Sequence, residues 1–193
     1  VPTPAHAEPT EAWQAPTLSI TRYDEDWSDL ADTEKRAHHW TGQFKYIPIS
    51  DDVWLSTGIE LRVRSENLEN NLWGSAQALN DSYVWFRALP YADLHAGKLR
   101  AFVQPIASTS ASVAPAPGAV DGTGADLLQG FVEADLGPVT LRGGRQMLSL
   151  GTERLIGTRY GPNVPLAFDG LRANVKLGAA TVSLLAVKPV QAR

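Results

Sequence analysis

The chain has 193 residues, of which 44% are hydrophobic and 20% are charged, and its formal net charge is −4. This balance excludes a disordered or fibrous chain and suits one domain with a sizeable core, while 16 glycines and 13 prolines favour short strands and turns over helices. The absence of cysteine excludes disulfides and thiolate metal sites. The sequence contains no run of 18 apolar residues, so no transmembrane helix is predicted.

The N-terminal residues do not resemble the strands that follow. Residues 1–7 read VPTPAHA, and small residues at Ala5 and Ala7 fit the A-x-A rule for signal-peptide cleavage. We interpret residues 1–7 as a signal-peptide remnant, with a chance Ala-Pro terminus as the alternative. Residues 8–42 form an acidic lead-in that we expect to be solvated, with a short helix near residues 28–37. Its carboxylates do not have the spacing of a calcium loop, so no metal site is predicted.

Residues 59–66 read IELRVRSE, in which apolar or small side chains alternate with charged ones. A period of two predicts a strand, because successive side chains point to opposite faces of a sheet. The alternating run covers residues 53–66, whereas strands of globular proteins have about five or six residues. This length suits a tilted strand that crosses a bilayer of about 30 Å.

The same alternation recurs along the rest of the chain. We predict strands at residues 43–50, 53–66, 82–92, 98–105, 127–136, 139–150, 169–177 and 181–187. The pattern fails at Gly143-Gly144-Arg145, where we expect a bulge or a bend, and it places Leu128 on the apolar outer face.

Short and long connections alternate between these strands. Long loops are predicted at residues 67–81, 106–125 and 151–167, and the other links are short. Outer-membrane barrels have this arrangement, with short turns on the periplasmic side and long loops outside. We therefore interpret the charged faces as the wall of a wet lumen and the apolar faces as lipid-facing.

Four segments resemble the N-terminal part of the alginate-export family of outer-membrane β-barrels. They are RYDEDWSDL at 22–30, KYIPI at 45–49, GIELRVRSE at 58–66 and GRQMLSLGTERLIGTRYGPNVPLAFDG at 144–170. The resemblance covers roughly residues 20–190. It implies an all-β, antiparallel up-and-down transmembrane barrel, of which residues 43–193 supply about seven to eight strands of a larger even-numbered set. It also implies a narrow, arginine-rich pore suited to a polyuronate.

The alternation places eleven charged side chains on the inner face, eight of them cationic. With Trp85, which shares a face with Arg87 and could stack on a sugar ring, the candidate pore-lining residues are Lys45, Glu60, Arg62, Arg64, Trp85, Arg87, Arg100, Glu133, Asp135, Arg142, Arg172 and Lys176. A cationic constriction favours anions. The alternative for each charged residue is pairing with an opposite charge on a neighbouring strand.

These features predict a passive outer-membrane pore that exports an anionic, alginate-like polysaccharide. An uptake porin for small anions or other solutes is one alternative, and a soluble carbohydrate-binding β-sandwich is another. The sandwich predicts that Leu61, Val63, Leu171, Ala173 and Val175 are packed in a core. No catalytic motif is present, so neither an enzyme nor a cofactor is expected. The expected partners are outer-membrane lipid, the polysaccharide and periplasmic secretion proteins, with no nucleic acid.

Overall fold

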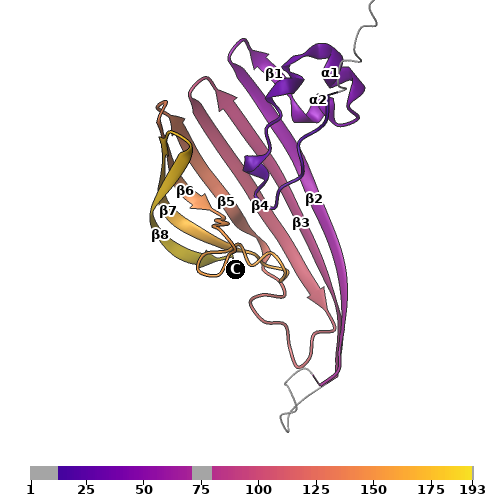
Figure 1. Cartoon of the computed structure of the whole chain (residues 1–193). Helices are drawn as coiled ribbons and strands as arrows, with labels where there is room; N and C mark the ends of the chain where they lie inside the picture. The colour runs from indigo at the N-terminus through magenta and orange to yellow at the C-terminus, as the bar shows by residue number, and fades with distance from the viewer. Residues whose placement is uncertain (1–12, 71–79, 193) are drawn as a thin grey trace, which may run out of the picture.

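The computed structural model describes residues 13–70 and 80–192. Eight antiparallel strands form one sheet in the order β1-β2-β3-β4-β5-β6-β7-β8, so each strand pairs with its neighbours in the sequence (Figure 1). The sheet is strongly curved and stays open between β1 and β8. This confirms the predicted up-and-down all-β fold of an incomplete barrel. The signal-peptide interpretation of residues 1–7 lies outside the described residues.

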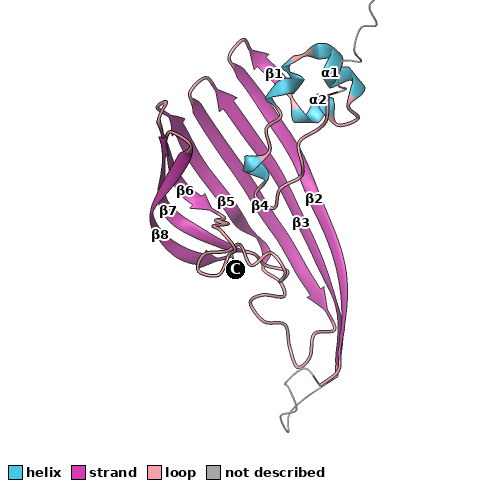
Figure 2. Cartoon of the chain, in the orientation of Figure 1, coloured by secondary structure: helices cyan, strands magenta, loops and turns pink. Residues whose placement is uncertain are grey.

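Four short helical segments precede and flank the first strand (Figure 2). They are η1 (Arg22–Asp24), η2 (Ser28–Ala31), α1 (Thr33–His38) and α2 (Gly42–Lys45). The predicted helix near residues 28–37 is confirmed by η2 and α1; Asp32 caps α1 by accepting hydrogen bonds from the backbone N–H groups of Glu34 and Lys35. None of the helices in the described part of the chain is long and apolar enough to span a membrane.

The strands are longer than most of the predicted ones. They are β1 (Ile47–Ser50), β2 (Val53–Leu68), β3 (Asp81–Ala96), β4 (Leu99–Ala111), β5 (Gly124–Asp135), β6 (Val139–Gln146), β7 (Leu166–Leu177) and β8 (Ala180–Gln191). The predicted loop at 106–125 is wrong at both ends, because β4 continues to Ala111 and β5 begins at Gly124. Two predicted strands were too long: residues 43–45 of the strand predicted at 43–50 belong to α2, and the strand predicted at 139–150 ends at Gln146.

The predicted alternation of short and long connections is confirmed. Two or three residues join β1 to β2, β3 to β4, β5 to β6 and β7 to β8, whereas residues 112–123 and 147–165 form long loops and most of the predicted loop at 67–81 lies outside the described residues. All short turns lie at one end of the sheet, the short-turn end, and the long loops lie at the other, the long-loop end (Figure 1).

The sheet has one irregularity that the sequence pattern misplaces. Of the bulge or bend predicted at Gly143-Gly144, the bulge is wrong, because β6 keeps a regular register with both β5 and β7. The bulge lies in β5 instead, where Gln104 pairs with Gln129 but Pro105 pairs with Leu127. Leu128 is therefore the extra residue, and it is fully buried on the concave side with Leu89 and Ile106, not on the outer face as expected.

Gly144 and Gly170 face each other across β6 and β7. Their φ angles are +132° and +149°, a region that side-chain-bearing residues rarely adopt. A Cβ added at Gly144 would lie 2.4 Å from the carbonyl oxygen of Gly130 and 2.8 Å from the Cα of Phe131. The glycine pair therefore permits a backbone shape and a strand approach that no other residue allows here.

We expect Gly144→Ala to lower the free energy of unfolding by about 1–3 kcal/mol, because alanine is strained at this φ and meets fixed backbone atoms. The measurement is the thermal unfolding midpoint of the purified protein in detergent. Gly161→Ala is the control, since its Cβ would meet nothing within 4 Å and its φ is not positive. Equal midpoints for the two variants would contradict the structural requirement for glycine at position 144.

The two faces of the sheet differ in chemistry. On the outer face, Leu61 and Val63 are each 71% exposed and Leu171 is 65% exposed. The sandwich alternative required these three side chains to be packed in a core, and they are not. The concave inner face carries polar and aromatic side chains, and the segment around Tyr23 and the 147–165 loop lie against it.

Candidate functional site

Most of the predicted pore-lining residues meet in two rows on the inner face. The first row crosses β4 to β7, where the strand register sets Arg100 beside Glu133, Glu133 beside Arg142 and Arg142 beside Arg172. The second row lies nearer the long-loop end, where Arg62 pairs with Arg87 and Arg64 pairs with Trp85. Cross-strand register thus brings together cations that are far apart in the sequence.

Acidic residues and rings hold the first row in place. Arg100 makes a forked contact with Asp93, with Nε–Oδ1 and Nη2–Oδ2 distances of 2.8 and 2.6 Å. Arg142 donates to Glu133 over 2.7 Å, and its guanidinium lies 4.2 Å from the ring centroids of both Tyr23 and Phe131. Arg172 has a different partner, the side-chain oxygen of Asn174, at 3.0 Å.

Carbonyl groups of the 147–165 loop hold the second row. Arg62 donates to the carbonyl oxygens of Tyr160, Gly161 and Pro162 at 2.7 to 3.1 Å, and Arg64 donates to that of Gly161 at 2.9 Å. This loop therefore folds back over the inner face. The sequence pattern gave no indication of this, because backbone carbonyls leave no trace in a sequence.

The acidic lead-in is solvated only in part: its carboxylates Asp24, Asp26, Asp29, Asp32 and Glu34 are exposed as expected, but Glu25 and three large apolar side chains are buried. Tyr23 and Trp27 are each 3% exposed and Leu30 is fully buried. The Tyr23 ring meets Phe102 and Phe131 edge to face, and its hydroxyl donates to the carbonyl of Met147. The physical cause is that the segment presents two kinds of side chain: the aromatic ones gain free energy by leaving water, while most of the carboxylates stay in it.

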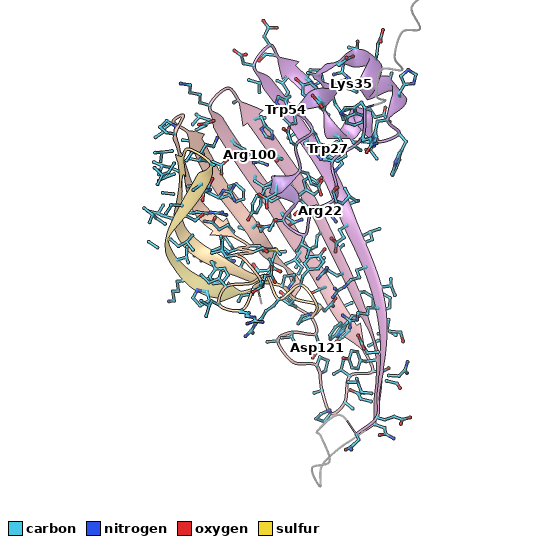
Figure 3. All side chains as sticks on the ribbon, in the orientation of Figure 1. Arg22, Trp27, Lys35, Trp54, Arg100 and Asp121 are labelled. Carbon is cyan, nitrogen blue, oxygen red and sulfur yellow. The ribbon has the colours of Figure 1, made fainter. Side chains whose placement is uncertain are left out.

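Glu60 connects the three parts of this interior. Its carboxylate accepts hydrogen bonds from Arg22 of the N-terminal segment at 3.0 Å, from Arg87 of β3 at 2.7 Å and from the hydroxyl of Tyr160 in the long loop. Arg22 lies over the inner face about midway along the strands (Figure 3). Sequence analysis placed Glu60 and Arg87 on one face but missed Arg22, Asp93 and Tyr160, which lie outside its strand pattern or its boundaries.

Three predicted residues, Asp135, Lys176 and Lys45, stand apart from the two rows, and Trp85 lies in the second row but is not open to a ligand. Asp135 and Lys176 are exposed towards the short-turn end of β5 and β7. Trp85 is 8% exposed and donates its indole N–H to Asp121 over 3.0 Å, so its ring is largely enclosed by protein. Lys45 was expected on a strand, but it ends helix α2 and lies over the rings of Trp27 and Tyr91.

Arg145 lies on the opposite side of the sheet from these groups. Its strand parity, its register with Asp169 and two hydrogen bonds of 2.8 and 3.1 Å to that carboxylate place it on the outer face. A third bond, of 3.0 Å, reaches the carbonyl of Leu127. The charge is thereby neutralised, and Arg145 is a natural control for the inward-facing arginines.

Comparison with known proteins gives one match. Residues 53–193 match the family model described as Alginate export. This range begins at β2 and includes both arginine rows, but it does not include residues 13–52 of the N-terminal segment. No curated protein and no solved structure matches the chain.

Proposed function

Since the chain belongs to the alginate-export family, we propose that it forms part of an outer-membrane pore through which an anionic polysaccharide, such as alginate, leaves the cell. Alginate export is a transport family and not an enzyme family, and the proposed activity is passive passage. The lipid-facing surface of this pore is the outer face with Leu61, Val63 and Leu171.

The observation that carries the proposal is the pair of arginine rows on the inner face. Six arginines from five strands lie there: Arg62, Arg64, Arg87, Arg100, Arg142 and Arg172. Such a wall lowers the electrostatic barrier for an anion where water is scarce. An alginate-like chain carries one carboxylate per sugar, so successive carboxylates can exchange between neighbouring guanidinium groups.

The partners of these arginines suggest how passage stays reversible. Arg62 is held by backbone carbonyls and Arg172 by an amide, and within the described residues neither makes an ion pair. A substrate carboxylate can replace these neutral acceptors without leaving a protein carboxylate unpaired. Arg87, Arg100 and Arg142 already neutralise acids, and this limits how tightly the wall holds an anion.

The test follows from that difference. We expect Arg62→Gln/Arg172→Gln to lower the anion preference of the protein in planar bilayers and to weaken block of chloride current by oligouronates roughly fivefold to tenfold. Both effects should shrink at high salt, because the Debye length falls from about 10 Å at 0.1 M to about 3 Å at 1 M.

Arg145→Gln is the matched control, since it removes an arginine from the outer face. Unchanged selectivity in the double variant, together with lost selectivity in Arg145→Gln, would overturn the proposal. Anion preference without oligouronate block would favour the alternative of a porin for small anions.

A further inference from the structure

A cavity of about 690 Å³ opens between the N-terminal segment and the first long strands, β2 and β3. It lies near the short-turn end, where α1 and α2 stand beside β2 (Figure 1). Its wall combines aromatic rings with cations, chiefly Arg22, Trp27, Trp40, Phe44, Lys45 and Tyr91. The arginine rows and the family match do not explain this combination, because most of the wall comes from residues before position 53.

Lys45 is the unusual group in this wall. Its ammonium donates to the hydroxyl of Tyr91 and lies 5.0 and 4.7 Å from the ring centroids of Trp27 and Tyr91. Within residues 13–70 and 80–192 it makes no ion pair, although it is half-buried. Burial lowers the pKa of Lys45, and the nearby carboxylate of Glu25, which is itself paired with Arg22, offsets only part of this effect.

Gly58 leaves the space that this ammonium occupies. A Cβ at that position would lie 2.8 Å from the Lys45 Nζ atom and 2.7 Å from the Tyr91 ring. Arg22, the other cation of the wall, is already neutralised by Glu25 and Glu60. Lys45 is therefore the group of this cavity that an incoming anion would complement.

The rings of the wall add a second requirement. Trp40 is 86% exposed and Phe44 is 53% exposed, although both line the cavity. Exposed aromatic surface beside a cavity indicates a binding site for a partner with an apolar face. A ligand that satisfies the whole wall must carry both an apolar ring face and one anionic group. A uronic acid has this combination, whereas a small inorganic anion lacks the ring face and a neutral sugar lacks the charge.

We infer that this cavity is a subsite for one uronate unit, in which Lys45 pairs with the carboxylate and Trp40 packs against the sugar ring. The inference rests on the proposed function for the nature of the substrate. It adds a place where the polysaccharide is held before it meets the arginine rows, and it assigns the N-terminal segment of the protein a role in binding.

Calorimetric titration of the purified protein with a mannuronate tetramer tests the subsite. We expect Lys45→Met to weaken binding about tenfold, because methionine keeps the length of the side chain and removes a charge-assisted contact. Trp40→Ala should weaken binding several-fold, and Trp40→Phe should restore most of it. Maltotetraose, which is neutral, should bind more weakly than the uronate by a similar factor.

Lys35→Met is the matched control, because Lys35 lies on α1, is paired with Asp29 and does not line the cavity. Wild-type affinity in both Lys45→Met and Trp40→Ala, or equal binding of the two tetramers, would overturn the subsite and leave the result for Arg62 and Arg172 untouched. Conversely, loss of binding in Lys45→Met with no anion preference in bilayers would support the subsite and overturn the export pore.

Discussion

Replacing Glu60 by alanine is expected to lower the free energy of unfolding by about 3–5 kcal/mol, the range typical of breaking a buried ion pair from one side. The side chain of Arg87 is fully buried and that of Glu60 is 16% exposed. Without the carboxylate, Arg87 and Arg22 lose the acid they share, and the Tyr160 hydroxyl loses its acceptor. The uncompensated guanidinium of Arg87 accounts for most of the expected loss.

The same substitution should release two segments together. Arg22 holds the N-terminal segment to Glu60, and Tyr160 holds the 147–165 loop to the same carboxylate. Limited trypsin digestion of the variant should therefore become faster after both Arg22 and Arg159. Glu60→Gln keeps a hydrogen-bond acceptor, so its rate of digestion should lie between those of the wild type and Glu60→Ala. Glu66→Ala is the control, because Glu66 pairs with the more exposed Arg64 on the same strand. Equal digestion of Glu60→Ala and Glu66→Ala would contradict the role of Glu60 as the junction.

The strands and their faces were predictable because the pattern that defines them is local. In β2, Leu61 and Val63 alternate with Arg62 and Arg64, and the two sets lie on opposite faces as their period of two requires. The end of β4 was missed because a local pattern can be recognised only where apolar side chains mark one of the faces. Residues 107–111 read ASTSA, where small side chains still alternate between the faces but carry no apolar signal for a sequence pattern to detect.

What covers the inner face could not be predicted, because it depends on contacts between distant residues. Nothing in the sequence near Tyr23 shows that its ring packs edge to face against the stacked rings of Phe102 and Phe131, under Arg142. The acidic composition of the segment predicted the exposed carboxylates correctly, but it did not reveal the buried aromatic contacts between them. The bulge at Leu128 was missed because Gly143-Gly144 gave a stronger local signal, although those glycines serve close packing and not a change of register.

The inner-face arginines differ in their partners. Arg87, Arg100 and Arg142 each neutralise an acid, so they hold the interior together whatever passes it. Arg62 and Arg172 are bound by neutral acceptors, and under the proposed function they are the cations that we expect an anionic substrate to engage. The sequence alone could predict that these charges share one face. Which of them are paired with acids could be seen only from their hydrogen-bond and ion-pair partners in the structure.

Asn163→Asp is expected to detach the 147–165 loop from the inner face. Asn163 is fully buried, and its amide nitrogen donates to the carbonyl oxygens of Phe86, Thr109 and Asp121 at 3.1, 3.1 and 2.8 Å. Aspartate has the same shape but turns this donor into a charged acceptor that faces three other acceptors. Because each buried polar group left unpaired costs about 1–3 kcal/mol, we expect a loss of at least about 3 kcal/mol in the free energy of unfolding.

Asn174→Asp provides the matched control for this change. The side-chain oxygen of Asn174 accepts hydrogen bonds from Arg172 and Ser183, so a carboxylate keeps both contacts and strengthens the one to Arg172. We expect the Asn174→Asp protein to unfold at or above the wild-type temperature and the Asn163→Asp protein well below it. In planar bilayers, Asn163→Asp should also raise single-channel conductance, because a detached loop no longer fills the space beside Arg62 and Arg87. If both variants unfold at the same temperature and conduct equally, the loop is not held by Asn163 and its position over the second arginine row has another cause.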